Sequence, residues 1–370
     1  MQNENINNIF CQKPKITTLY NSQIGAVVFL TTLSFKLSSL PAIVSEYLSS
    51  STLWFYIALS VIDILEFALV YLFFKDGSDE ALSDKIPYKI GIVILFLFLD
   101  LKCVGYFAFA VLFFTVELYV GISPVIVVSI LFVPMLYLGF KGGRTIARTA
   151  EILAPIILAI IVLNLIFLDC NIDFNRNLPI LSMPLKNVAV HSLKYGLWLG
   201  NFFPLFFVKV QNKKNPYVST SVAVTHIITI VVVMVGVAMY GNAMKLLGNL
   251  LVEISGFNQL STEIGRMEWT ALFAVIVMGV IEISFLFFGI SECSLRLTRS
   301  RLPALIIVVG TVLLLSFILP SPQVIADLAH TSTVGVIMLT ISLLLPIYFL
   351  ILKAIYKKNN KKHRSTKESL

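Results

Sequence analysis

The stretch IGAVVFLTTLSFKLSSLP, residues Ile24 to Pro41, decides the fold of this chain. It begins as an apolar helix suited to a lipid bilayer and is then interrupted by polar side chains, namely Thr31, Thr32, Ser34, Lys36, Ser38 and Ser39. Pro41 follows, and proline removes a backbone donor and clashes with the preceding turn. Within a bilayer such an interruption is tolerated only beside protein or a wet cavity. We therefore expect a discontinuous first span that lines a small-molecule site; a continuous Ser/Thr-rich helix with Lys36 extended toward the headgroups is the alternative.

The composition places the chain among polytopic membrane proteins. Of its 370 residues, 58% are hydrophobic and only 13% are charged, and the mean hydropathy is +0.90. A soluble domain carries roughly a quarter charged residues. The polar segment Met1 to Lys15 predicts no cleaved signal peptide, since no short apolar region and cleavage site follow it. The cysteines lie far apart without a CxxC motif, so we expect no disulfide and no metal site among Cys11, Cys103, Cys170 and Cys293.

Apolar runs of about 20 residues predict ten transmembrane helices. Their expected ranges are 18–47, 53–74, 89–118, 122–140, 147–168, 190–210, 217–241, 267–291, 302–320 and 332–355. Most of the 28 basic residues fall in alternate connecting segments and in the tail. The opposite segments hold only Arg176, Lys186, Lys194, Lys245 and Arg266. Because basic residues collect on the cytoplasmic side, both termini are expected there, and the net charge of +8 indicates topology rather than nucleic-acid binding.

Ten spans divide into two halves of five, and an odd number per half inverts the second half relative to the first. The sixth span, HSLKYGLWLGNFFP from His191 to Pro204, is also interrupted, by Gly196, Gly200 and Asn201. Interrupted spans at matching places in two halves indicate an inverted-repeat transporter site, although glycines also form close helix-packing faces. The predicted fold is an all-α membrane protein with a five-plus-five inverted repeat and discontinuous helices 1 and 6. Its expected parts are a cytoplasmic tail (1–17), the first repeat (18–168), an external loop (169–189), the second repeat (190–355) with an external amphipathic segment (242–264), and a basic cytoplasmic tail (356–370).

Two stretches carry a family resemblance. GGRTIARTAEILAPIIL, Gly142 to Leu158, and GRMEW, Gly265 to Trp269, resemble the spore germination permease family, and the resemblance extends from Thr17 to about Lys357. This family provides the B-type membrane subunit of nutrient germinant receptors and belongs to the amino acid–polyamine–organocation superfamily. The resemblance implies a germinant, often an amino acid, bound in a midplane pocket, with A-type and C-type subunits as partners in the spore inner membrane. Members of the superfamily commonly have glycine at the break of the first span, where this chain has Phe35, Lys36 and Leu37.

Ionisable residues within the expected spans are hypotheses of function because they are costly in a bilayer. Asp63 and Glu66 are three residues apart on one helix face and are positioned to share a proton, although an ion pair with Lys36 or Lys102 fits the same pattern. Lys36 and Asp100 form a second plausible pair; alternatively, the Lys36 ammonium replaces a coupling cation or meets a ligand carboxylate. We assign an ion or proton relay to Asp63, Glu66, Asp100 and Lys102.

The resemblance implies that spans 1, 3, 6 and 8 surround the ligand. Glu282 lies midway along the eighth span and is either a proton site or the acceptor of a ligand amine. The predicted ligand-binding residues are the polar, small and aromatic positions where these spans converge: Ser34, Lys36, Ser38, Val104, Tyr106, Phe107, Tyr195, Gly196, Leu199, Gly200, Glu282 and Phe287.

Two functions share this fold, a germinant-sensing subunit and an autonomous proton-coupled transporter of amino acids or other solutes. An enzyme is disfavoured because the histidines are scattered, at His191, His226, His330 and His363, and because the chain has no GxxxxGK[ST] nucleotide loop. We expect no cofactor, no metal and no nucleic acid. The expected partners are the germinant, the two receptor subunits and the lipid bilayer.

Overall fold

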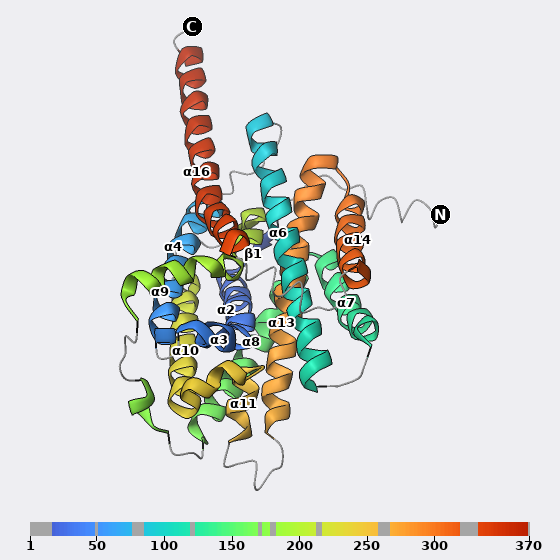
Figure 1. Cartoon of the computed structure of the whole chain (residues 1–370). Coiled ribbons are helices and arrows are strands. Elements are labelled where there is room, and N and C mark those ends of the chain that lie inside the picture. The colour runs from blue at the N-terminus through green and yellow to red at the C-terminus, as the bar shows by residue number, and fades with distance from the viewer. Residues whose placement is uncertain are drawn as a thin grey trace.

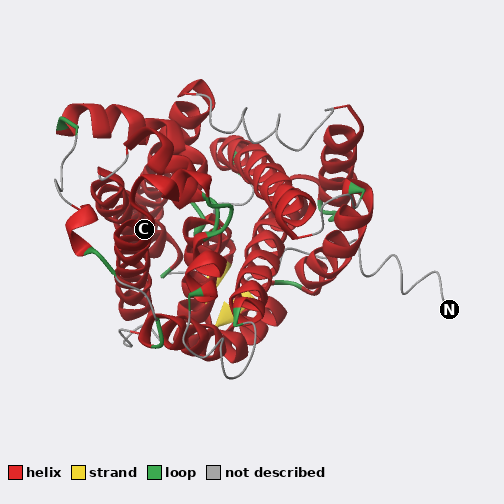
Figure 2. Cartoon of the chain, turned by 60° about the horizontal axis from the view of Figure 1, so that its bottom comes forward, coloured by secondary structure: helices red, strands yellow, loops and turns green. Residues whose placement is uncertain are grey.

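The computed structural model describes the chain as an almost entirely helical membrane protein (Figures 1 and 2). Two short strands, β1 (Thr17–Leu19) and β2 (Val208–Val210), pair in parallel with Thr17 opposite Val208. The described residues are 17–48, 51–75, 85–118, 123–168, 172–177, 183–211, 217–257, 267–318 and 332–368.

Six helices in these ranges are long and apolar enough to cross a bilayer. They belong to α4 (Thr52–Phe74), α6 (Ile86–Leu112), α8 (Gly143–Ile166), α10 (Tyr217–Tyr240), α13 (Glu268–Thr298) and α16 (Ser332–Glu368). A seventh candidate is the pair α2 (Asn21–Leu37) and α3 (Leu40–Leu48), whose axes bend by 41° at a break of a few residues. The predicted interruption of the first helix is therefore present, immediately before Pro41.

Two further expected spans are helical, and one has a different form. Helix α7 (Pro124–Lys141) and helix α14 (Leu302–Ile318) occupy the expected spans 122–140 and 302–320. The expected span 190–210 is not a continuous helix. It consists of the end of α9 (Leu185–Ser192), the 3₁₀ segments η4 (Leu193–Trp198) and η5 (Phe203–Phe207), and strand β2. The glycines that predicted an interruption thus accompany a complete loss of α-helix.

The connecting segments also differ from expectation. The predicted amphipathic helix at 242–264 is two short pieces, η6 (Gly241–Leu246) and α11 (Leu250–Gly256), and residues 258–266 lie outside the described ranges. Met244, Leu251 and Ile254 are buried, and the pieces pack on α3 and α13. This segment is therefore part of the protein core rather than a helix lying on lipid. The turn η3 (Phe174–Asn177) packs against α10, and a short π-helical stretch, η2 (Phe113–Leu118), extends α6.

Helix α2 is the centre of the bundle, as it packs against α8, α10 and α13. It is buried along nearly its whole length, including Thr31, Ser34 and Lys36. The Thr31 hydroxyl donates to the carbonyl oxygen of Val27, 2.9 Å away, so it needs no partner from lipid. The polar residues in the second half of α2 are enclosed by protein, which removes the alternative in which Lys36 extends toward the headgroups.

Helix α16 crosses η4 with the two backbones in direct contact. A Cβ atom added at Gly196 would collide with the backbone of Gly335, and one added at Gly335 would collide with the backbone of Lys194. Glycine permits this approach because it has no side chain. The crossing holds η4 against a regular helix. We call residues 193–207, from η4 to the end of η5, the irregular segment.

A buried ion cluster closes the end of α13. Glu292 accepts hydrogen bonds from Arg296 at 2.7 Å and from Arg301 at 2.8 Å, one on each carboxylate oxygen. The Arg296 guanidinium also lies 4.2 Å from the centre of the Phe207 ring. Between the two arginines, Arg299 takes a left-handed conformation with φ of 59° and ends the helix.

Replacing Gly335 by valine should destabilise the protein, because the added side chain has no space at the crossing with η4. Overpacking of this kind costs about 1–3 kcal/mol. The matched control is Gly310→Val in α14, where an added Cβ meets nothing within 4 Å. Thermal unfolding of the purified chains in detergent measures the difference, and equal unfolding temperatures for the two variants would contradict the crossing.

Candidate functional site

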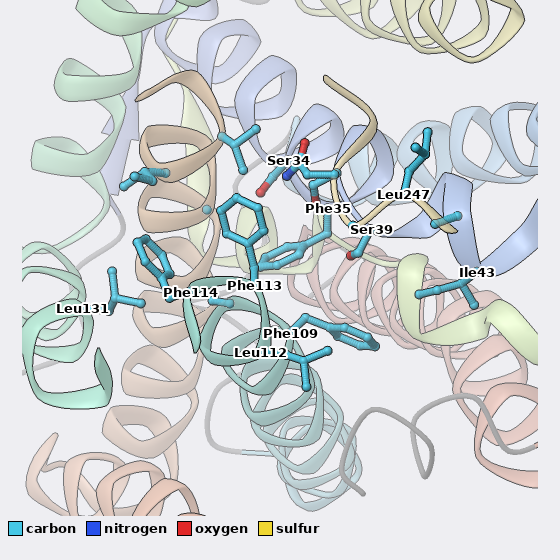
Figure 3. Close-up of a pocket in the computed structure, with 18 of the residues that line it drawn as sticks. Ser34, Phe35, Ser39, Ile43, Phe109, Leu112, Phe113, Phe114, Leu131 and Leu247 are labelled. Carbon is cyan, nitrogen blue, oxygen red and sulfur yellow. The ribbon is translucent and has the colours of Figure 1, made fainter. Parts of the chain in front are cut away.

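A cavity of about 540 Å³ lies beside the break between α2 and α3 (Figure 3). Its walls come from α2, α3, α6, α7 and α13, and its remaining sides from η4 and from the connection between η6 and α11. Helix α11, which follows the lining connection, lies toward the end of the molecule opposite the end of α16 (Figure 1). Small-molecule sites have volumes of about 300–1,000 Å³ and are mostly apolar with a few placed polar groups. The size and lining of this cavity match that description.

The break itself satisfies its backbone groups through other elements. The Ser34 carbonyl accepts from the Ser38 N–H at 3.3 Å, and the Ser38 carbonyl accepts from the Leu250 N–H of α11 at 3.2 Å. The Tyr56 hydroxyl donates to the Lys36 carbonyl at 2.8 Å. Because these carbonyls have partners within the protein, α2 can end inside the bundle.

Three predicted ligand residues line the cavity directly: Ser34, Ser38 and Tyr195. The ring of Phe35 forms part of the same wall and stacks on Tyr106, with ring centres 4.6 Å apart and planes inclined by 27°. Trp198 lies next to Tyr106, with ring centres 5.3 Å apart. This aromatic group separates the cavity from a set of buried charges behind it.

Lys36 forms an ion pair with Asp63, and both side chains are at most 2% exposed. Asp100, the other partner considered from the sequence, lies elsewhere. It is partly buried on another face of α6, where the Thr311 hydroxyl approaches it at 3.5 Å. Asp63 is therefore the partner of Lys36 because α4, not α6, brings a carboxylate to this point.

Lys102 binds the irregular segment. Its ammonium donates to the carbonyl oxygens of Leu197, at 2.6 Å, and of Leu199, and it lies 4.8 Å from the centre of the Tyr106 ring. The helical geometry of the backbone ends here, since η4 ends at Trp198. A buried ammonium thus replaces the helical N–H groups that the segment lacks.

Two further contacts hold the same segment. The Gly200 N–H donates to Glu66 Oε2 at 2.8 Å, and Gly200 has φ of 78°, a conformation that favours glycine. Asn201 donates to the Thr31 carbonyl at 3.0 Å and accepts from the Tyr106 hydroxyl at 3.0 Å. Asn201 therefore joins the irregular segment to α2 and α6 together.

Glu282 lies immediately behind the cavity wall. It is 1% exposed, and among the described residues neither of its carboxylate oxygens makes a hydrogen bond of good geometry. The Ser34 side chain, the Phe35 backbone and the Tyr106 hydroxyl are its polar neighbours. Glu282 is one turn further along α13 than Gly279, which lines the cavity.

The other predicted ligand residues are buried in the surrounding packing and do not line the cavity. Phe107 packs edge-on against Phe132 of α7, and Phe287 against Phe140, with ring centres 5.4 Å and 5.1 Å apart. The remaining members of this group are Val104, Gly196, Leu199 and Gly200.

Several lining residues were not predicted. Phe109 and Phe113 continue the face of α6 that carries Tyr106, so helical spacing from that residue would have found them. The connection 245–249 forms a roof over the cavity, and no sequence pattern placed it there. His226 of α10 is 4% exposed, and its Nε2 atom has no hydrogen bond within the described chain. It lies near the Lys36–Asp63 pair.

Replacing Lys36 by methionine should destabilise the protein strongly, because Asp63 is left as an unpaired charge in the bundle. Loss of one partner of a buried pair costs about 3–5 kcal/mol. The double variant Lys36→Met/Asp63→Asn should recover most of this loss. Chemical or thermal unfolding of the three proteins measures it, and equal stability of the single and double variants would contradict the pairing.

The stability of helix α11, which follows the roof, should depend on pH. Partial burial and the neighbouring Glu268 carboxylate raise the pKa of Glu253 above its ordinary value. An acid whose pKa is higher in the folded state favours folding at low pH, and that contribution falls as the pH rises from about 4.3 through the folded pKa. Glu253→Gln removes this loss, so its stability relative to the original chain should increase between about pH 4 and pH 7. Unfolding temperatures measured across this range test it, and parallel curves would contradict it.

Comparison with protein families places this geometry in context. The sequence matches the profile of the spore germination proteins, the spore permease family, over residues 76–325. A comparison with curated proteins finds no significant match. The matched region contains α6, α13, the irregular segment and most of the cavity lining, and it covers more than half of the chain. This multi-pass membrane protein therefore belongs to the spore germination permease family.

Proposed function

We propose that the chain is the integral membrane subunit of a spore nutrient germinant receptor. It binds a small germinant, such as an amino acid, in the cavity beside the α2–α3 break and signals to A-type and C-type partner subunits. The observation that carries this proposal is the cavity itself, since a break in a buried membrane helix lines a space of ligand size. Membership of the spore germination family supports the receptor role.

The proposed topology is a five-plus-five inverted repeat of ten spans, with discontinuous spans 1 and 6 and both termini in the cytoplasm. The meeting of the two interrupted segments supports it, because Asn201 of the irregular segment donates to the Thr31 carbonyl of α2. The basic residues beyond Lys353 support the orientation. The membrane is then the spore inner membrane, and the cavity faces the side away from the cytoplasm.

The site in this proposal has two layers. Ser34, Ser38 and Tyr195 contact the ligand, and Glu282 acts on it from behind the wall. The second layer contains the proposed relay residues Asp63, Glu66 and Lys102, whose contacts with Lys36 and with residues 197–200 couple the cavity to the irregular segment.

Signalling requires that the ligand binds one of two states more tightly. The hydrogen bond from the Leu250 N–H to the Ser38 carbonyl joins the break to α11, directly after the roof at 245–249. A ligand that moves Ser38 therefore moves the roof, which is the outermost described part of the site. The roof is the proposed route to the partner subunits.

The alternative function is an autonomous proton-coupled transporter of amino acids or related solutes. The buried charges behind the cavity favour it, because they are suited to a proton relay. Purified chain in liposomes decides between the two: substrate-driven proton uptake without partner subunits identifies a transporter, whereas stability that requires the A-type and C-type subunits identifies the receptor.

A cavity-filling variant tests the ligand site. Leucine at Gly279 projects into the cavity, since an added Cβ there lies 3.9 Å from the Ser34 hydroxyl and meets nothing closer. Amino acids, nucleosides and sugars are screened for thermal stabilisation of the purified chain, and a ligand present at 100 times its Kd contributes about 2.7 kcal/mol.

Gly279→Leu should abolish this stabilisation, and spores that carry it should lose the response to the same nutrient. Gly310→Leu, the matched substitution in an open position of α14, should retain both. An unchanged response in the Gly279 variant would place the ligand elsewhere.

A further inference from the structure

Five charged side chains form a buried cluster behind the cavity wall. Its members are Lys36, Asp63, Glu66, Lys102 and Glu282, and each is at most 1% exposed. They act on one another electrostatically across α2, α4, α6 and α13. Three carboxylates face two ammonium groups, so the cluster has one negative charge in excess when all five are ionised.

The hydrogen bonds assign this excess to one residue. Lys36 pairs with one oxygen of Asp63. Lys102 donates to two carbonyl oxygens of the irregular segment, and Glu66 accepts from the Gly200 N–H. Of the three carboxylates, Glu282 alone has both oxygens without a hydrogen bond of good geometry among the described residues. Lys102 is the charge that acts most on Glu282, but its ammonium donates to the two carbonyl oxygens instead, so among the described residues Glu282 has no direct ion-pair partner.

His226 does not supply the missing positive charge. It stands near the Lys36–Asp63 pair on α10, but an imidazolium needs an acceptor for each of its two N–H groups. Its Nε2 atom has no such acceptor in the described part of the chain. The neutral form fits this environment.

Glu282 is also the cluster member that the cavity approaches along α13. Gly279 and Val280 line the cavity, as do Ser34 and Phe35 (Figure 3), and the Ser34 side chain and the Phe35 backbone are also neighbours of Glu282. Ser34 interacts with the Glu282 side chain, so its hydroxyl reaches both the cavity and the carboxylate. A cation placed against Ser34 would be held by that carboxylate from behind.

We propose that the ligand of this cavity is an organic ammonium ion with an apolar body, and that the ammonium group, not a carboxylate, is the required feature. This rests on the proposed function, which takes the cavity as the ligand site. An unpaired carboxylate in a bundle interior is strongly unfavourable, and a ligand ammonium supplies its counter-charge. Phe35, Phe109 and Phe113 supply apolar and aromatic surface for the ligand body.

Other charges near the cavity do not reverse this assignment. The C-terminus of α2 and the N-terminus of α3 meet at the break, and their helix dipoles have opposite sign there. Lys245 and Glu46 at the rim are exposed and are screened by solvent. Lys194, partly buried, is the remaining rim cation. The rim tolerates a ligand carboxylate, whereas the buried carboxylate of Glu282 requires a cation.

Matched compounds that differ only in their charged groups test the proposal. The sets are phenylalanine, phenethylamine and 3-phenylpropionate; leucine, isoamylamine and 4-methylpentanoate; and alanine, ethylamine and propionate. Each is added to the purified full-length chain, and the unfolding temperature is measured against concentration. In at least one of the three sets, the amine and the amino acid should both stabilise the protein. Their apparent affinities should differ by less than about tenfold, which corresponds to about 1.4 kcal/mol. The acid should have no effect.

Glu282→Gln should weaken the response to the amine by at least about tenfold and, without ligand, should unfold at the same or a higher temperature, because it removes an unpaired buried charge. Glu151→Gln, which removes a carboxylate bound to Ser22 away from the cavity, should respond like the original chain. If the Glu282 variant does not fold, Gly279→Leu replaces it and should abolish the amine response.

The outcomes separate the two proposals. Stabilisation by acids, or only by nucleosides or sugars, would overturn the ammonium requirement and leave the cavity as a ligand site. An undiminished amine response in the Glu282 variant would also overturn it. No stabilisation by any compound in either screen would overturn the proposed function together with this inference.

Discussion

The structure around the cavity depends on the two hydrogen bonds that the Lys102 ammonium donates to the carbonyl oxygens of Leu197 and Leu199. A chain segment without helical hydrogen bonds cannot face lipid, because each unpaired polar group costs several kcal/mol there. Lys102 satisfies two such groups with one side chain and gains hydrogen bonds for its own buried charge. The irregular segment, and with it one wall of the cavity, therefore has a place inside the bundle.

Irregular backbone and buried charge support each other throughout this region. Glu66 pairs with the Gly200 N–H, and Asn201 bridges α2 and α6. The same groups would be severely destabilising in a continuous apolar bundle. Glu282 is the exception, since among the described residues no cation is in direct contact with it. A site for an external molecule arises at the position where this internal pairing is incomplete.

The sequence predicted the class of the protein and the break in its first helix, because composition and the polar run before Pro41 have direct physical consequences. It also indicated a buried partner for Lys36. It could not choose Asp63 over Asp100, since that depends on how α4 and α6 are rotated against α2. The roof at 245–249 escaped prediction for a similar reason: a short turn carries no periodic signal, and only packing places it over the cavity.

The pairing of β1 with β2 constrains the order in which the protein folds. Strand β1 is synthesised long before β2, so Thr17 cannot pair with Val208 until most of the chain has been made. Until then the start of α2 has an open strand edge, which is a hazard for wrong association. Helix α2 therefore reaches its final surroundings only after the second half of the chain has supplied β2, α10 and α13.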